Sequence, residues 1–337
     1  MKYRYLGNSG LKVSEICLGV MTFNGGKQSE IGSVDQHEAN EIVEVALDNG
    51  INFFDTADVY SNGISEEILG KALGKRRNEA ILATKVRFPM DKGVNNTGLS
   101  RYHIIESCEA SLKRLGTDHI DLYQIHGYDK GTPLEETLRA LDELLSSGKV
   151  RYIGCSNLSA WHTMKALAIS EKLGLEKFIT TQLYYSIGVR DIEHELVPLC
   201  LDQHLGILCW SPLSGGFFTG KFRRESDGPA NARRSHKDAY SLKFWALDEE
   251  KGYQILDALD VVAGRMEKSV SQLALGWLLH QPAVTSVIVG ARNKKQLLEN
   301  LSASGLMIAA SDIALLNSAS APVIPYPQSH QLTSDPR

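Results

Sequence analysis

Short apolar runs alternate along the chain with segments in which apolar residues recur at every third or fourth position, and this alternation predicts strands separated by helices. The predicted strands are residues 16–20, 52–56, 80–86, 120–126, 150–156, 180–185, 206–211 and 285–290. Eight strands that alternate with helices fit either a closed (β/α)8 barrel or an open doubly wound sheet. The pattern predicts an α/β protein and leaves both architectures open.

The segments between the predicted strands contain helix start and stop signals. Ser100 precedes a segment with helical periodicity, and Gly116 is placed to end it. In the stretch TPLEE, Thr132 can cap a helix, Pro133 occupies the first helical position and Glu135 completes a capping box. These signals predict separate helices between the strands, as repeated βα units require.

Two segments fall outside this alternation. Residues 2–15, with the sequence KYRYLGNSGLKVSE, fit a β-hairpin around the turn GNSG. Residues 214–250 form a long connection rich in charged and aromatic residues, and we expect this insertion to cover a cofactor and shape a substrate pocket. We predict one domain over residues 1–337, with this insertion among its long loops.

The composition limits the classes of partner. The chain has 337 residues, of which 43% are apolar and 23% charged, with a formal net charge of −4. No run of Lys and Arg is long enough to neutralise a row of phosphates, so nucleic acid is not an expected partner. The N-terminus lacks an apolar signal region, no apolar run reaches about 18 residues, and the five cysteines are widely spaced. We therefore expect a cytoplasmic protein with reduced thiols and no membrane span.

Several nucleotide and metal motifs are absent or incomplete. An open dinucleotide-binding sheet normally has G-x-G-x-x-G after its first strand, and the chain contains no G-x-G. Residues 215–222, GGFFTGKF, resemble a P-loop but have Phe222 where a Ser or Thr would bind magnesium. His194 and Glu195 begin a zinc motif that no second histidine completes. These observations disfavour a Rossmann site and an NTPase, and we expect no metal.

Three consecutive predicted strands end on polar residues, namely Asp55, Lys85 and His126, and Tyr60 follows the first of them closely. In a (β/α)8 barrel these strand ends meet at the C-terminal mouth, where active sites of this architecture lie. Lys85 would then lower the pKa of Tyr60, Asp55 would hold Lys85, and His126 would orient a substrate oxygen. Such a group can protonate a developing alkoxide if a hydride donor is present.

The alternative interpretation of these residues is structural. Asp55 and Lys85 would form a buried ion pair, Tyr60 would pack at a rim, and His126 would be an ordinary strand-end histidine. That alternative is the commoner one for any single residue. Four such residues near consecutive strand ends favour a site.

At these residues the sequence resembles the aldo-keto reductases over nearly its whole length. The matching stretches are GINFFDTADVYSNGISEEILG, ATK, DLYQIH, GCSN, CWSPLSGGFFTGK and SVIVGARNKKQLLENL. The resemblance implies a (β/α)8 TIM barrel with an N-terminal β-hairpin and long loops at the C-terminal face, which binds a nicotinamide cofactor without a Rossmann fold. It also implies a catalytic tetrad of Asp55, Tyr60, Lys85 and His126, with Tyr60 as the general acid or base.

The same resemblance implies a cofactor site. Ser156, Asn157 and Gln182 would hydrogen-bond the nicotinamide carboxamide, and Trp210 would stack on its ring where the family usually has tyrosine. The remaining expected cofactor contacts are, for the pyrophosphate, Ser211, Leu213, Gly216 and Lys221, and, for the adenosine end, Gly290, Arg292, Gln296 and Asn300. Arg292, together with Lys294 and Lys295 at a helix start capped by Asn293, predicts recognition of a 2′-phosphate and hence NADP(H).

The expected substrate is a small carbonyl or alcohol, contacted by Phe23, Val59 and Arg87. The sequence also looks close to the bacterial branches of the family and to the potassium-channel β subunits. The second likeness leaves open an alternative function, an NADP-binding regulatory subunit with weak turnover. A homo-oligomer is compatible with either function.

Overall fold

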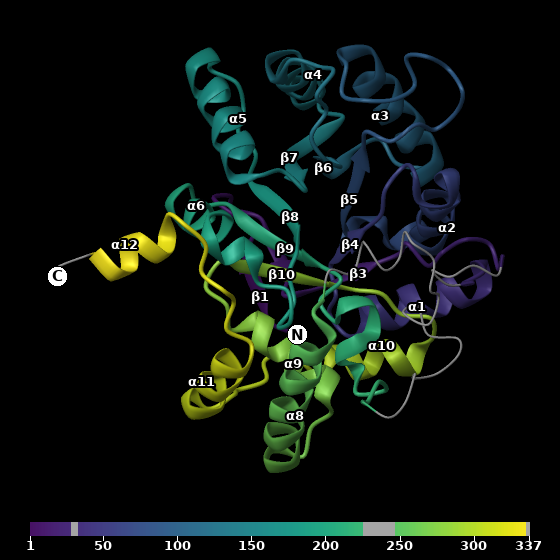
Figure 1. Cartoon of the computed structure of the whole chain (residues 1–337). Coiled ribbons are helices and arrows are strands. Elements are labelled where there is room, and N and C mark those ends of the chain that lie inside the picture. Colours follow the sequence, from purple (N-terminus) through teal and green to yellow (C-terminus); the bar gives the residue numbers. More distant parts are fainter. Residues whose placement is uncertain (28–32, 225–246, 335–337) are drawn as a thin grey trace.

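The computed structural model describes residues 1–27, 33–224 and 247–334. Eight parallel strands close into a barrel in the order β10-β3-β4-β5-β6-β7-β8-β9 (Figure 1). Their bounds are β3 Ile16–Gly19, β4 Phe53–Asp55, β5 Ile81–Val86, β6 Ile120–Ile125, β7 Val150–Ser156, β8 Thr180–Tyr184, β9 Gly206–Trp210 and β10 Val284–Val289. The closed barrel is therefore confirmed, and the open doubly wound sheet is excluded.

The predicted hairpin is also confirmed. Strands β1 (Tyr3–Tyr5) and β2 (Lys12–Ser14) pair antiparallel, and the Leu6 amide donates to Leu11 O at 2.8 Å. The fully buried side chains of Leu6 and Val13 pack with interior residues of the barrel strands. The hairpin thus covers the interior of the barrel at the end where the strands begin.

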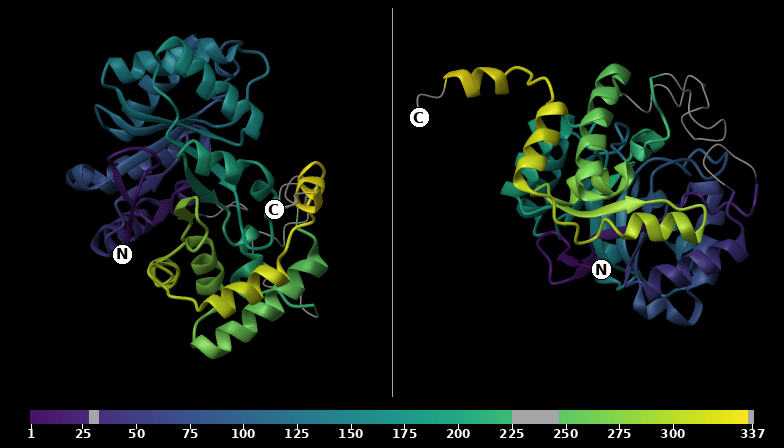
Figure 2. Two further views of the ribbon diagram at one scale, coloured as in Figure 1. Left: turned by 90° about the vertical axis from the view of Figure 1, so that its left-hand side faces the viewer. Right: turned by 90° about the horizontal axis from the view of Figure 1, so that it is seen from below.

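Most of the helices surround the barrel (Figure 2), and their apolar residues belong to the same buried core as those of the strands. Their bounds are α1 Gln36–Asp48, α2 Ile64–Leu73, α3 Arg101–Leu115, α4 Leu134–Ser146, α5 Ala160–Leu173, α6 Leu196–Asp202, α8 Glu249–Met266, α9 Val270–Leu279, α10 Lys294–Leu301, α11 Ala310–Ala319 and α12 Gln328–Ser334, with 3₁₀ turns η1 Tyr60–Gly63, η2 Gly74–Glu79, η3 Asp191–His194 and η4 Ser214–Thr219. Figure 2 shows α12 projecting away from the other helices. Within the described ranges, no helix combines the length and apolarity that crossing a bilayer requires.

The predicted ends of α3 are confirmed, but the predicted cap of α4 is wrong. Ser100 Oγ accepts the His103 amide, and Gly116 ends α3 in the left-handed conformation. Thr132 does not cap α4, because the helix begins at Leu134 and Pro133 takes the cap position. The Thr132 hydroxyl donates to Asp129 Oδ2 at 2.7 Å.

The strand alternation determines which side chains reach the mouth of the barrel. Successive residues of a strand point to opposite faces, so residues two apart share one face. Phe53, Ala83 and Leu122 lie in the apolar interior of the barrel. Asp55 and Lys85, two positions further along their strands, therefore stand directly above this interior layer, at the ends where the strands finish.

The insertion predicted at residues 214–250 is described only in part. Residues 225–246 lie outside the described residues. The part of the insertion before this gap is bonded to α8, since Arg224 donates to Asp257 and Glu250 and Arg223 donates to Asp260.

Candidate active site

The mouth of the barrel brings the four predicted catalytic side chains together. Lys85 Nζ donates to Asp55 Oδ1 at 2.5 Å and to Thr56 O at 2.8 Å, and it lies 3.4 Å from the Tyr60 hydroxyl. Lys85 has no exposed surface, and Asp55 is almost fully buried. A buried ammonium therefore stands between a carboxylate and a phenol.

Tyr60 reaches this ammonium because the chain turns sharply after β4. The Asp58 amide still donates to Lys85 O, so the chain stays against β5 until this point. Ser61 and Asn62 then take left-handed conformations with φ of 49° and 56°, and Gly63 follows with φ of 90°. A Cβ at Gly63 would lie 2.6 Å from Arg114 Cδ, so this turn requires glycine at that position.

His126 lies beside the phenol, immediately after β6. Its ring contacts the Tyr60 ring edge-on at 5.8 Å between centroids, and its Nδ1 is buried without a hydrogen-bond partner among the described residues. Burial holds the pKa of His126 well below its ordinary value, and the positive charges of Lys85 and Arg87 add to this. A neutral imidazole has one N–H donor, which can orient a substrate oxygen.

The electrostatics correct one expectation for Tyr60. Burial raises the pKa of Tyr60 above its ordinary value, and the opposing effect of Lys85 does not cancel the increase. Burial would lower the pKa of Lys85, but attraction to Asp55 and Tyr60 outweighs it and the pKa is raised. Near neutral pH the phenol is therefore protonated beside a charged ammonium, which is the state that a proton donor needs.

Two glutamines complete the surroundings of Asp55. Its Oδ2 accepts from Gln182 Nε2 at 2.8 Å and from Gln124 Nε2 at 3.2 Å. The NH₂ group of Gln182 is bonded to Asp55 in this conformation, and its expected contact with the nicotinamide carboxamide stays a prediction. Gln124 is a site residue that was not predicted, although it shares the inward face of β6 with Leu122 and the alternation in DLYQIH could have revealed it.

Ser156, Asn157 and Trp210 form a connected group beside the tetrad. Asn157 has a left-handed φ of 56°, and its Nδ2 donates to Ser156 Oγ at 3.0 Å and to His126 O at 3.3 Å. Its Oδ1 accepts from Trp210 Nε1 at 3.0 Å. The Trp210 ring is stacked on Tyr184 with 4.6 Å between centroids. This network fixes the orientation of the indole. A tyrosine ring has no N–H group, so tyrosine at this position would not make the same bond to Asn157.

The expected pyrophosphate segment winds tightly after β9. Ser211, Ser214, Gly215 and Gly216 all have positive φ values between 48° and 97°. The amides of Ser214, Gly215 and Gly216 bond within the turn, to Ser211 and Leu213. Lys221 and the half-buried Leu213 lie in the same segment. A Cβ at Gly216 would meet no atom of the described residues within 4 Å, so these residues leave open space beside this backbone.

The N-terminus of α10 offers donors to an anion. Asn293 caps the helix as predicted, since its side chain accepts the Gln296 amide. The amides of Lys294 and Lys295 have no partner among the described residues. Gln296 Oε1 accepts the Arg292 amide at 2.9 Å, and Asn300 Nδ2 donates to Gly290 O at 3.5 Å, so the four expected adenosine contacts are bonded in two pairs. Unsatisfied amides beside basic side chains fit a phosphate.

The three expected substrate contacts have different positions. Val59 and Arg87 are half-buried at the mouth; Val59 precedes Tyr60 in sequence, and Arg87 follows Lys85 by two positions. Phe23 has no exposed surface and packs in the core, so in this conformation it cannot contact a substrate.

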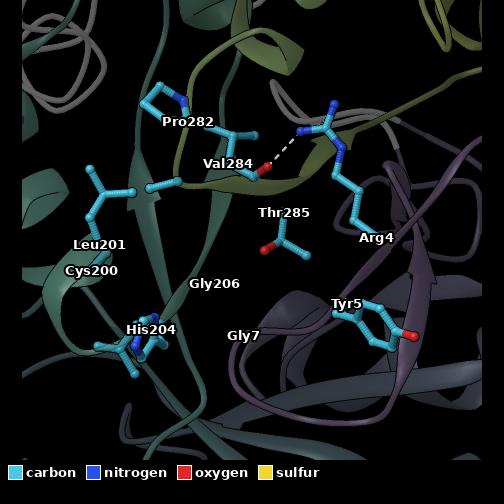
Figure 3. A pocket seen from close by; sticks show the side chains of 12 residues that line it. Arg4, Tyr5, Gly7, Cys200, Leu201, His204, Gly206, Pro282, Val284 and Thr285 are labelled. Carbon is cyan, nitrogen blue, oxygen red and sulfur yellow. Dashed lines mark hydrogen bonds between the residues drawn. The ribbon is translucent and has the colours of Figure 1, made fainter.

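A hollow of about 320 Å³ lies at the opposite end of the barrel, where β9 and β10 begin (Figure 3). Arg4 lines it, but the guanidinium of Arg4 donates to Glu15, to Leu279 O and to Val284 O. This charge therefore serves to hold the hairpin on the barrel. The hollow contains none of the tetrad residues, so the chemistry belongs to the mouth.

Comparison with known proteins agrees with this geometry. The family model described as "Aldo/keto reductase family" matches residues 15–321. The "Uncharacterized oxidoreductase YrpG" of Bacillus subtilis is 39% identical over 94% of this chain and 95% of its own. The "Versiconal hemiacetal acetate reductase" of Aspergillus parasiticus is 35% identical over 97% and 99%. A "Probable voltage-gated potassium channel subunit beta" of Arabidopsis thaliana is 36% identical over 94% of each chain. The chain belongs to the aldo/keto reductase family.

Proposed function

We propose that the protein is an NADP(H)-dependent reductase that interconverts an aldehyde or ketone and the corresponding alcohol, with Tyr60 as the general acid or base. The observation that supports this most directly is the 3.4 Å approach of the Tyr60 hydroxyl to Lys85 Nζ, which is itself paired with Asp55. The substrate is a small carbonyl or alcohol, and residues 1–337 act as one domain.

Each residue of the tetrad has a distinct task in this proposal. The bound cofactor supplies the hydride. Tyr60 gives its proton to the substrate oxygen as negative charge develops there, and the Lys85 ammonium stabilises the phenolate that remains. Asp55 keeps Lys85 charged and in place, and His126 donates a hydrogen bond that orients the carbonyl. In the reverse direction Tyr60 accepts the proton from the alcohol.

Three features support a nicotinamide cofactor with a 2′-phosphate. Family members typically use nicotinamide cofactors. The Asn157–Trp210 bond holds an aromatic ring at the mouth, where it can stack on the nicotinamide. The unsatisfied amides at the start of α10 and the cation of Arg292 favour a phosphate over a neutral ribose hydroxyl. We therefore assign the adenosine end to Gly290, Arg292, Gln296 and Asn300.

The relatives named as channel subunits favour a second candidate function. In that case the protein binds NADP(H) but acts mainly on a partner protein, and its turnover is weak. Cofactor binding does not separate the two functions, because both require it. Turnover does.

The test combines binding with turnover. NADPH and NADH are titrated by calorimetry, and NADPH oxidation is followed at 340 nm with a panel of aldehydes, ketones and dicarbonyls. A reductase binds NADPH more tightly than NADH and reduces at least one class of carbonyl. Tight binding without turnover favours the regulatory function, and a protein that binds neither nucleotide contradicts both.

A further inference from the structure

A phenylalanine and an arginine extend the site beyond His126. The Phe88 ring contacts the His126 ring edge-on, with 5.0 Å between centroids. The Arg87 guanidinium lies over the Phe88 ring, 4.9 Å from its centroid. Phe88 is 36% exposed, so part of this ring remains accessible beside the imidazole. An aromatic surface and a positive charge therefore adjoin the residue that orients the substrate oxygen.

The charge of Arg87 is not neutralised by an ion pair within the described ranges. Its Nε donates to Tyr128 O at 3.0 Å, and no carboxylate oxygen in these ranges lies within 4.0 Å of its nitrogens. Asp129 is close enough for Arg87 to contribute to lowering its pKa. The oxygens of Asp129, however, already accept from Leu99 N, Gly131 N and the Thr132 hydroxyl.

A half-buried guanidinium without a counter-charge favours an anionic partner, because part of its hydration is already lost. The fork of donors in Arg is suited to a carboxylate. The bond to Tyr128 O uses Nε and leaves the two terminal nitrogens for such a partner. The neighbouring Phe88 ring favours an aromatic group over an aliphatic chain, since paired rings gain from their geometry as well as from buried area.

We propose that Phe88 and Arg87 form a specificity subsite for aromatic aldehydes and ketones that have an acidic substituent on the ring. The carbonyl lies at Tyr60 and His126, the ring packs on Phe88, and the acid binds Arg87. This proposal rests on the proposed reductase function. It adds Phe88 to the site and gives a chemical reason for Arg87 at the mouth.

The test compares 4-carboxybenzaldehyde with methyl 4-formylbenzoate, which has nearly the same shape and no charge. A charged hydrogen bond to Arg87 predicts that kcat/KM of the native protein favours the acid on the order of 10- to 100-fold. Arg87→Met brings this ratio near one, and Arg87→Lys gives an intermediate value. Arg139→Met, which removes an exposed arginine from α4, retains the native ratio. Because both substrates are measured on the same sample, the ratio does not depend on the fraction of folded protein.

A second variant tests the aromatic part of the subsite. Phe88→Leu lowers kcat/KM for both aryl substrates relative to propanal and retains the ratio of acid to ester. A native ratio near one, or an unchanged ratio in Arg87→Met, would overturn the role of Arg87. An unchanged preference for aryl substrates over propanal in Phe88→Leu would overturn the role of Phe88.

Binding of terephthalate separates this inference from the proposed function. The native protein saturated with NADPH is expected to bind this non-reducible dicarboxylate, and Arg87→Met is expected to bind it at least about 10-fold more weakly. If this difference appears while no carbonyl is reduced, the subsite stands and the reductase function fails. If carbonyls are reduced but terephthalate binds both proteins alike, the subsite fails and the reductase function stands.

Discussion

Asp58 stands between the tetrad residues Asp55 and Tyr60 in sequence and is fully buried. Its Oδ1 accepts the Val59 amide at 2.6 Å, while its Oδ2 has no hydrogen-bond partner among the described residues. The pKa of Asp58 is raised to about 7, first by burial and then by the charge of Glu66, while the Val59 amide, Arg114 and Lys85 oppose the increase. We predict that replacing Asp58 with Asn changes how the stability of the protein depends on pH.

The sign and size follow from proton linkage. Between pH 3.8 and about 7 the folded protein holds the Asp58 proton while the unfolded chain has lost it, so stability falls as pH rises through this window. Each pH unit contributes about 1.4 kcal/mol, and the whole interval therefore contributes about 4 kcal/mol of destabilisation above pH 7. Asp58→Asn cannot ionise and lacks this loss.

The assay is urea unfolding, followed by tryptophan fluorescence, at a series of pH values from 4 to 8.5. The free energy of unfolding of Asp58→Asn should increase relative to that of the native protein by about 4 kcal/mol from the low-pH to the high-pH end of the series. The pH dependence of this difference reports the ionisation of the Asp58 carboxyl group alone, because any contribution from the contacts of the asparagine is the same at every pH. Asp202→Asn, which removes an exposed carboxylate at the end of α6, should follow the native curve. A constant difference between Asp58→Asn and the native protein would refute the reasoning.

Two further substitutions test the site itself. Lys85→Met should lower kcat by about 10² to 10⁴ in rate assays, because the phenolate loses the ammonium that stabilises it. It should also destabilise the fold by roughly 3 kcal/mol or more in denaturation curves, because Asp55 is left buried without its counter-charge. A variant that is active and fully stable would contradict both effects. Arg292→Gln should weaken NADPH binding roughly 10-fold and leave NADH binding nearly unchanged, and equal weakening of the two in calorimetry would exclude recognition of the 2′-phosphate by this residue.

The sequence predicts most of the fold, because each barrel strand is buried on both faces and appears as a short apolar run between punctuated helices. The tetrad could be predicted for the same reason, since Asp55, Lys85 and His126 interrupt or end those runs with groups that have no place in an apolar core. Ser100 and Asn293 were correctly expected as caps, because their bonds are local and no nearby group competes with them.

Other features depend on where the elements begin and on how they pack, which the sequence pattern does not give. Thr132 is not the cap because α4 begins one residue later than predicted, with Pro133 at the cap position. The bond between Gln182 and Asp55, which are 127 positions apart, forms because closure of the barrel brings the two together. Phe23 is buried by packing that its own sequence does not specify. The direction of the pKa shift of Tyr60 depends on the balance between burial, which raises the pKa, and the charge of Lys85, which lowers it. The spacing of residues in the sequence does not give this balance.

The most direct test of the central claim is the reduction of an aldehyde by Tyr60→Phe, with NADPH binding measured on the same sample. The account predicts that NADPH binds as it does to the native protein, since Tyr60 lies among the tetrad and outside the assigned cofactor contacts. It also predicts that kcat falls by about 10² or more, because among the described residues only the Tyr60 hydroxyl bonds to Lys85 Nζ with a proton to give. Native turnover in Tyr60→Phe would contradict the assignment of Tyr60 as the proton donor.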